Sequence, residues 1–88
     1  MQGGFRFYEA KERGLGGYFL DTLLSDIDSL QLYAGVHSMH FGRYYRLLSR
    51  RFPYGIYYQM CGNEIFVRAV LDLRRDPNWI ARKLKNLV

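Results

Sequence analysis

The side chains that could do chemistry in this sequence are mostly cations, and they concentrate in its second half. Residues 1–42 carry three Lys or Arg against five Asp or Glu, whereas residues 43–88 carry ten against three. A region with this balance attracts acidic protein surfaces or nucleic acid. The alternative is a solvated charged surface that serves solubility only, and composition does not separate the two.

Two groups of these residues are candidate binding sites. The first is a basic sheet face formed by side chains of the expected strands and their connections: Arg46, Arg50 and Arg68. It would contact a partner protein or RNA phosphates, unless it is simply solvated. The second group surrounds the start of a terminal helix and would contact a target: Arg74, Arg75, Trp79, Arg82 and Lys83. Trp79 is suited to anchor an interface, although it could equally close the core.

Other kinds of site have weaker support in the sequence. His37 and His40 are three residues apart and Cys61 is distant, whereas a metal site needs at least three placed ligands. The glycines of residues 14–17 follow no strand and precede no lysine, so they favour a turn over a phosphate loop. No Ser-His-Asp arrangement is visible. We therefore expect no metal, no cofactor and no catalytic residue, and we expect Cys61 to be a small buried strand residue.

Length and composition predict one small cytoplasmic domain spanning residues 1–88. The chain has 88 residues, 49% of them hydrophobic, which argues against disorder. Its eight Tyr suit a surface that meets a partner. A single cysteine fits a reducing compartment. The N-terminus shows no signal peptide, and no uncharged stretch is long enough for a bilayer, so we expect no membrane partner.

Helical periodicity dominates the first half. Residues 5–13 read as the end of a first helix, which Gly14 can terminate. A second helix is predicted from about 17 to 32, because Leu20, Leu23, Leu24, Ile27 and Leu30 follow the spacing of one helix face. A short glycine-rich connection between the two helices predicts an antiparallel helical hairpin.

The second half changes to strand periodicity and ends in a short helix. Strands are predicted over 43–48, 54–61 and 64–73, with a further short strand near 38–41. Gly62-Asn63 suits a primed hairpin turn. Asp76 and Pro77 fit the cap and first position of a helix that ends in cations. We expect an α+β fold, with the helical hairpin packed on a three- to four-stranded antiparallel sheet and a short C-terminal helix.

Three stretches in this order resemble the ParE/RelE superfamily of plasmid-stabilisation toxins, and its ParE branch most. Residues 8–20, YEAKERGLGGYFL, are similar to the hairpin turn of that family. Residues 46–58, RLLSRRFPYGIYY, resemble its central strands. Residues 70–77, VLDLRRDP, resemble its closing strand. The resemblance covers about residues 5–84.

The resemblance implies the toxin of a type II toxin–antitoxin system. A ParE-like protein would bind and inhibit DNA gyrase, with its C-terminal region contributing to toxicity, and a cognate antitoxin would neutralise it. Partly disordered, acidic antitoxins suit a basic toxin. The residues that we expect to meet the antitoxin lie on the hairpin and the central strands: Tyr18, Leu23, Tyr44 and Tyr57. A homo-oligomer is a further possibility.

Three departures from the family pattern keep two other functions open. Gly55 stands where the RelE branch, which cleaves mRNA on the ribosome, has an arginine, and Asp72 stands where many relatives have histidine. Compared with the family, the chain is also short at its N-terminus, which would leave a sheet edge open. The alternatives to a gyrase inhibitor are a RelE-like endoribonuclease and a non-toxic interaction module of the same fold.

Overall fold

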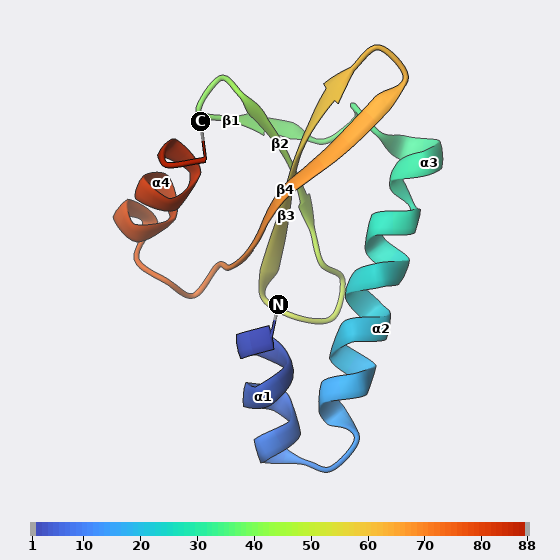
Figure 1. Cartoon of the computed structure of the whole chain (residues 1–88), viewed down its shortest axis with the longest axis vertical. Helices are drawn as coiled ribbons and strands as arrows, with labels where there is room; N and C mark the ends of the chain where they lie inside the picture. The colour runs from blue at the N-terminus through green and yellow to red at the C-terminus, as the bar shows by residue number, and fades with distance from the viewer. Residues whose placement is uncertain (1, 88) are drawn as a thin grey trace.

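The computed structural model describes residues 2–87, without the side chains of residues 2, 3 and 5. In this range a helical hairpin is followed by a four-stranded sheet and a terminal helix (Figure 1). The α+β fold predicted from the sequence is confirmed. The elements are α1 (Gln2–Lys11), α2 (Leu15–Asp28), α3 (Leu30–Tyr33), β1 (Ser38–His40), β2 (Tyr44–Leu48), β3 (Tyr54–Cys61), β4 (Glu64–Asp72) and α4 (Pro77–Lys85).

The turn between α1 and α2 is fixed by one carboxylate. Gly14 adopts a positive φ of 87°, where glycine avoids the strain of a side chain. As the N-cap of α2, Gly14 offers no side chain to the first helical amides. Glu9 of α1 supplies that acceptor, because its Oε1 receives the amides of Gly14 and Gly16 at 3.1 and 3.0 Å. The helical hairpin predicted from the glycine-rich segment is therefore stabilised by Glu9 of α1, whose carboxylate caps the N-terminus of α2.

The helix predicted over 17–32 begins earlier and is interrupted near its end. α2 starts at Leu15, and Ser29 separates it from the single turn of α3. The Ser29 hydroxyl donates to the carbonyl oxygen of Asp26 at 2.5 Å. A serine side chain that bonds the backbone within its own turn competes with the helical ladder. Leucine periodicity continues across this position, and therefore it did not reveal the break.

The sheet is an antiparallel meander in the order β1-β2-β3-β4. Gly62, the first central residue of the β3–β4 turn, has a φ of 60°, as a type II′ hairpin turn requires. Further along this hairpin, Tyr57 pairs with Ala69 but Tyr58 pairs with Val67, so Arg68 is the extra residue of a β-bulge. The bulge shifts the register of β4 by one residue relative to strict alternation.

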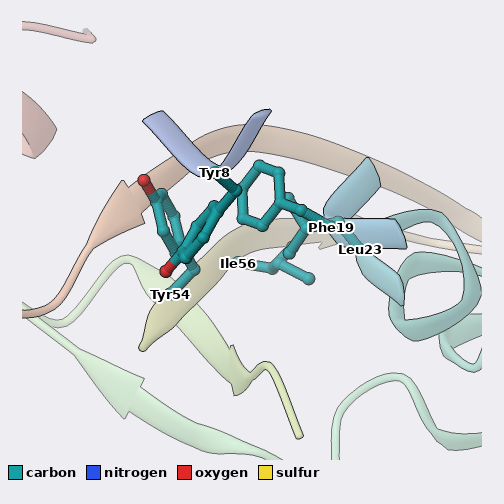
Figure 2. Packing of buried hydrophobic residues seen from close by; sticks show 5 residues of the cluster. All are labelled: Tyr8, Phe19, Leu23, Tyr54 and Ile56. Atoms are coloured by element: carbon teal, nitrogen blue, oxygen red, sulfur yellow. The ribbon is translucent and has the colours of Figure 1, made fainter. Parts of the chain in front are cut away.

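Two aromatic cores lie on opposite faces of this sheet. The hairpin covers one face, where the core residues are Tyr8, Phe19, Leu23, Tyr54 and Ile56 (Figure 2). On the other face α4 covers a core of Tyr44, Tyr57, Ile80 and Leu84. Figure 1 shows α2 and α4 on either side of the strands. None of the helices within residues 2–87 has the length and apolar character needed to cross a membrane.

Candidate functional site

The candidate site lies where α4 meets the β1–β2 hairpin. Asp76 caps α4 by accepting the amide of Asn78 at 3.0 Å, and Pro77 occupies its first turn, as the sequence predicts. Ile80 and Leu84 point into the core. At the far end of the helix the buried Tyr44 hydroxyl donates to the carbonyl oxygen of Leu84 at 3.2 Å. This bond satisfies a carbonyl of the last turn and fixes α4 across β2.

A groove runs between α4 and the β1–β2 hairpin, and we call it the α4 groove. It consists of two hollows, of about 270 and 460 Å³, and Phe41 lines both of them. Arg46 and Arg75 line the smaller hollow, while Arg43 and Lys85 line the larger. Among the described residues that line either hollow, none is acidic. Four cations gathered on apolar walls favour an anionic ligand or an acidic protein surface.

Arg46 is held in this groove by the small size of its neighbour across the strands. A Cβ atom added at Gly55 would lie 3.3 Å from Cδ of Arg46 and 3.0 Å from Cδ2 of Leu73. Glycine at position 55 therefore lets the arginine stem lie flat against β3. The Nε atom of Arg46 is buried and has no hydrogen-bond partner within the described chain. A buried donor without a partner is costly to the fold.

His40 lies beside Arg46 in the smaller hollow and is biased toward its neutral form. Partial burial lowers its pKa, and the nearby positive charge of Arg46 lowers it further. Its Nε2 lies 3.2 Å from the hydroxyl of Ser38. A neutral imidazole between cations can accept a proton, which is the role of a general base.

Phe41 is the residue with the least favourable backbone in the described chain. It has a φ of 58°, and Gly42 follows with a φ of 66°. Both are central residues of the β1–β2 turn, which the amide of Arg43 closes on the carbonyl of His40 at 3.2 Å. Type I′ turns place Asn-Gly in such positions, whereas a bulky residue there is strained. The strained aromatic ring is 60% exposed, at the mouth of the groove.

The structure brings together only part of the group predicted around the terminal helix. Arg75 and Lys83 both lie over the ring of Trp79, with the cations 4.7 and 5.3 Å from its centroid. Arg74 turns the other way, forming an ion pair with Asp72 at 2.8 Å and lying over Phe7. Arg82 is exposed on the side of α4 that faces away from Ile80 and Leu84. Trp79 itself packs partly against the core under α4, which is the core role considered for it.

The predicted basic sheet face does not exist as one surface. Arg46 lies in the α4 groove. Arg50 lies in the β2–β3 connection and pairs at 3.2 Å with Asp26, a buried residue of the helical hairpin. Arg68 is the bulge residue of β4, where it donates to Gln59 at 2.9 Å. The loop and the bulge separate cations that strand alternation alone had placed together.

Three of the four residues predicted to meet an antitoxin are buried. Leu23 belongs to the core under the hairpin, and Tyr44 and Tyr57 belong to the core under α4. These three predictions were wrong, because large apolar and aromatic side chains are typical of protein interfaces and of cores alike. Tyr18 is 46% exposed and packs edge-on against Phe52. Further exposed apolar side chains lie toward the end of α2, in α3 and just after it: Leu24, Leu32, Tyr33 and Val36.

The prediction for Cys61 was also wrong, because this thiol is exposed at the end of β3, next to the hairpin turn. Within residues 2–87 there is no group of three or more His, Cys, Asp or Glu side chains that could hold a metal ion. Sequence reasoning considered His40 only as a metal ligand, and it overlooked Phe41, Arg43 and Lys85. A bulky residue before Gly42, in the turn between two strand-like segments, is the signal that could have identified Phe41.

In comparisons with known proteins, no family model, curated protein or solved structure matches the chain.

Proposed function

We propose that this chain is the toxin of a type II toxin–antitoxin system of the ParE/RelE type, acting in the cytoplasm by binding its target. The proposed target is DNA gyrase. The observation that carries this proposal is the α4 groove, where Arg43, Arg46, Arg75 and Lys85 face an open hollow. The groove is built from α4, from residues 40–44 of the β1–β2 hairpin, and from parts of two stretches that resemble the ParE branch, which contribute Arg46 and Arg75. Inhibition by binding needs no hydrolytic group, only a surface complementary to the target.

The position of Gly55 supports binding over cleavage. In the resemblance to the RelE branch, this position would carry an arginine of the ribonuclease site. Here Leu73, Tyr57 and Arg46 lie 3.0 to 3.3 Å from where a Cβ atom would be. A side chain at position 55 would therefore require Leu73, Tyr57 and Arg46 to shift.

The proposed antitoxin would cover the apolar end of the helical hairpin. Leu32 is 81% exposed there, and Tyr33 and Val36 are exposed beside it. An exposed apolar cluster of this kind marks a surface that another protein covers. An amphipathic antitoxin helix would bury these side chains, while an acidic segment of the same chain would neutralise the α4 groove.

A second candidate function, endoribonuclease, is favoured by one feature of the groove. His40, Arg46 and Arg75 line the same hollow of about 270 Å³. Phosphodiester cleavage needs a base to activate the 2′-hydroxyl and cations to stabilise the phosphate charge that develops. His40, with its lowered pKa, would supply the base, and the two arginines would supply the charge.

Controlled expression of the chain alone separates these functions. Plasmid supercoiling and total mRNA would be followed in the same bacterial culture after induction. Growth arrest with relaxed plasmid and intact mRNA is the expected result for a gyrase inhibitor. Early mRNA cleavage would instead support the ribonuclease. Normal growth with abundant folded protein would overturn both and leave an interaction module.

Two variants test whether the α4 groove is responsible. Arg46→Ala removes the cation with the unpartnered Nε atom and should relieve growth arrest. Arg13→Ala removes an exposed cation from the distant α1–α2 turn and should not (Figure 1). Equal arrest by both variants at equal protein level would contradict the role of the groove.

A further inference from the structure

The outer edge of β4 is a second candidate binding surface, which adjoins the α4 groove at Arg75. Within residues 2–87 the sheet ends at β1 on one side and at β4 on the other. The β1 edge is three residues long, whereas the β4 edge is nine. Folded proteins usually shorten, cover or charge such an edge, because its free backbone groups pair with other chains.

The alternation of hydrogen bonds along the strands shows which backbone groups of β4 are not bonded to β3. The amide of Leu73 donates to the carbonyl of Pro53 at 2.8 Å, and the amide of Ser49 donates to that of Tyr54 at 2.9 Å. Alternate residues of an antiparallel strand bond to the same neighbour. In the observed register, Val70 therefore directs its amide and carbonyl away from β3, as does Val67 beyond the bulge. Asp72 also faces away from β3, but only its amide is free, because its carbonyl accepts the amide of Arg75 at 3.2 Å.

A groove of about 410 Å³, which we call the edge groove, lies along this free edge. Gly4 and Phe7 of α1 line it on one side, and Arg75 and Trp79 line it on the other. Alternate side chains of a strand added here would point to opposite sides of the sheet. One set would meet Phe7 and Val70, and the other would meet Trp79 and its cations.

The net charge of this second side is positive. Arg75 and Lys83 both lie over the Trp79 ring. Asp72, which also lines the edge groove, is already paired with Arg74 at 2.8 Å. The ion pair leaves the two cations on Trp79 without an acidic partner among the described residues that line the groove.

We propose that the β4 edge binds an extended acidic peptide segment of another protein as an added strand. Apolar side chains of the segment alternate with carboxylates, which face Arg75 and Lys83. The added strand bonds to the outward amides and carbonyls of Val67 and Val70 and to the amide of Asp72. This mode of recognition takes its affinity from backbone hydrogen bonds and its specificity from alternate side chains. The edge groove adjoins the α4 groove, since Arg75 lines both, but the proposal does not depend on the toxin function.

Binding of synthetic peptides to the full chain tests the proposal directly. The probe is a short acetylated and amidated peptide in which valine alternates with glutamate, labelled for fluorescence anisotropy. A peptide with lysine in place of glutamate tests the charge. A glutamate peptide methylated on alternate backbone nitrogens tests the strand pairing. We expect measurable binding of the first peptide only, with slowed exchange of the Val70 amide in its presence.

Two matched variants locate the binding at β4. Val67→Pro removes an outward amide while leaving the bonds between β3 and β4, and should weaken binding about tenfold, as expected for the loss of a backbone hydrogen bond. Val67→Ala shortens the same exposed side chain but keeps the amide, and should bind like the wild type. Arg75→Gln should weaken binding about two- to fivefold, as expected for an exposed charge.

Three results would overturn the proposal. The first is equal binding of the glutamate and lysine peptides, and the second is unchanged binding by Val67→Pro. The third is a dimer in sedimentation that becomes a monomer in Val67→Pro, because a second copy of the chain would then occupy the edge. Each result can be obtained whether or not expression of the chain arrests growth.

Discussion

The two faces of the sheet carry similar aromatic cores but are covered very differently. On the hairpin side, two helices enclose a cluster in which Phe19 contacts the rings of Tyr8, Phe52 and Tyr54 at centroid distances of 4.9 to 5.0 Å. On the other side, the single nine-residue helix α4 covers its core and leaves open hollows at the margins. The helices enclose the core on the hairpin face, whereas α4 leaves the margins of the other core uncovered.

The charges follow the same division. Under the hairpin, the buried Asp26 is paired with Arg50, whose side chain is 75% exposed. Around α4, the cations Arg43, Arg46 and Lys85 line hollows and are not paired with carboxylates in the described chain. We propose a division of roles, in which the hairpin face supplies stability and the α4 face offers its charge to a partner. Variants on each face test this division.

Phe19→Ala should have the largest effect. Phe19 is fully buried at the centre of the hairpin core (Figure 2). Truncation of a buried aromatic costs about 3–5 kcal/mol, most of the stability that a small domain has. Urea unfolding followed by circular dichroism would measure the loss. A loss under about 1 kcal/mol would show that the hairpin face does not dominate stability.

Leu84→Ala should cost less, about 2–3 kcal/mol, at the lower end for a buried leucine. Leu84 is buried, but its neighbours are a single helix and a half-open margin. Hydrogen exchange should quicken throughout α4 while the α1–α2 hairpin keeps its protection. Leu87→Ala, at an exposed position just after α4, serves as the control and should change stability little. Equal loss of protection on both faces would contradict separate roles.

Phe41→Asn should stabilise the fold by about 1 kcal/mol, because asparagine tolerates the positive φ of this turn. Growth arrest by the same variant should weaken, since the α4 groove loses its exposed ring. Phe41→Leu keeps the strain and should not be stabilised, which urea titration would show. A stability gain in Phe41→Leu equal to that in Phe41→Asn would assign the effect to lost apolar exposure instead.

Acid titration should show the smallest effect, at the Asp72–Arg74 pair. The hydrogen bonds and charge of Arg74 lower the pKa of Asp72 in the folded chain. The unfolded chain therefore binds this proton first as pH falls. The stabilisation is present above about pH 4, the usual range of an unfolded aspartate, and is lost as pH falls through the folded pKa. Asp72→Asn should flatten this part of the stability profile, and an unchanged acid slope would contradict the assignment.

The local elements could be predicted because they depend on near neighbours. Asp76 and Pro77 mark the start of α4, Gly62 marks the β3–β4 turn, and leucine spacing marks α2. Each of these signals is a backbone conformation or a periodicity that a few adjacent residues impose. The α+β fold followed from their order.

The candidate site could be predicted only in part. Arg46 and Arg75 were recognised as candidates, but the sequence assigned them to different surfaces, and the structure places them in one hollow. Tyr44 and Tyr57 were expected on the surface and are buried. An amphipathic residue suits a core and an interface equally, so the packing of α4 had to decide between them.

The sequence by itself determined the helical hairpin, the meander, the capped terminal helix and the excess of cations after residue 42. Only the tertiary structure decided which cations share a groove, which tyrosines are buried and which sheet edge remains free. The physical reason is the separation along the chain over which each kind of interaction acts. Caps, turns and periodicity act over a few residues, whereas the α4 groove joins Arg46 to Arg75 and the edge groove joins Phe7 to Trp79 through the packing of the whole chain.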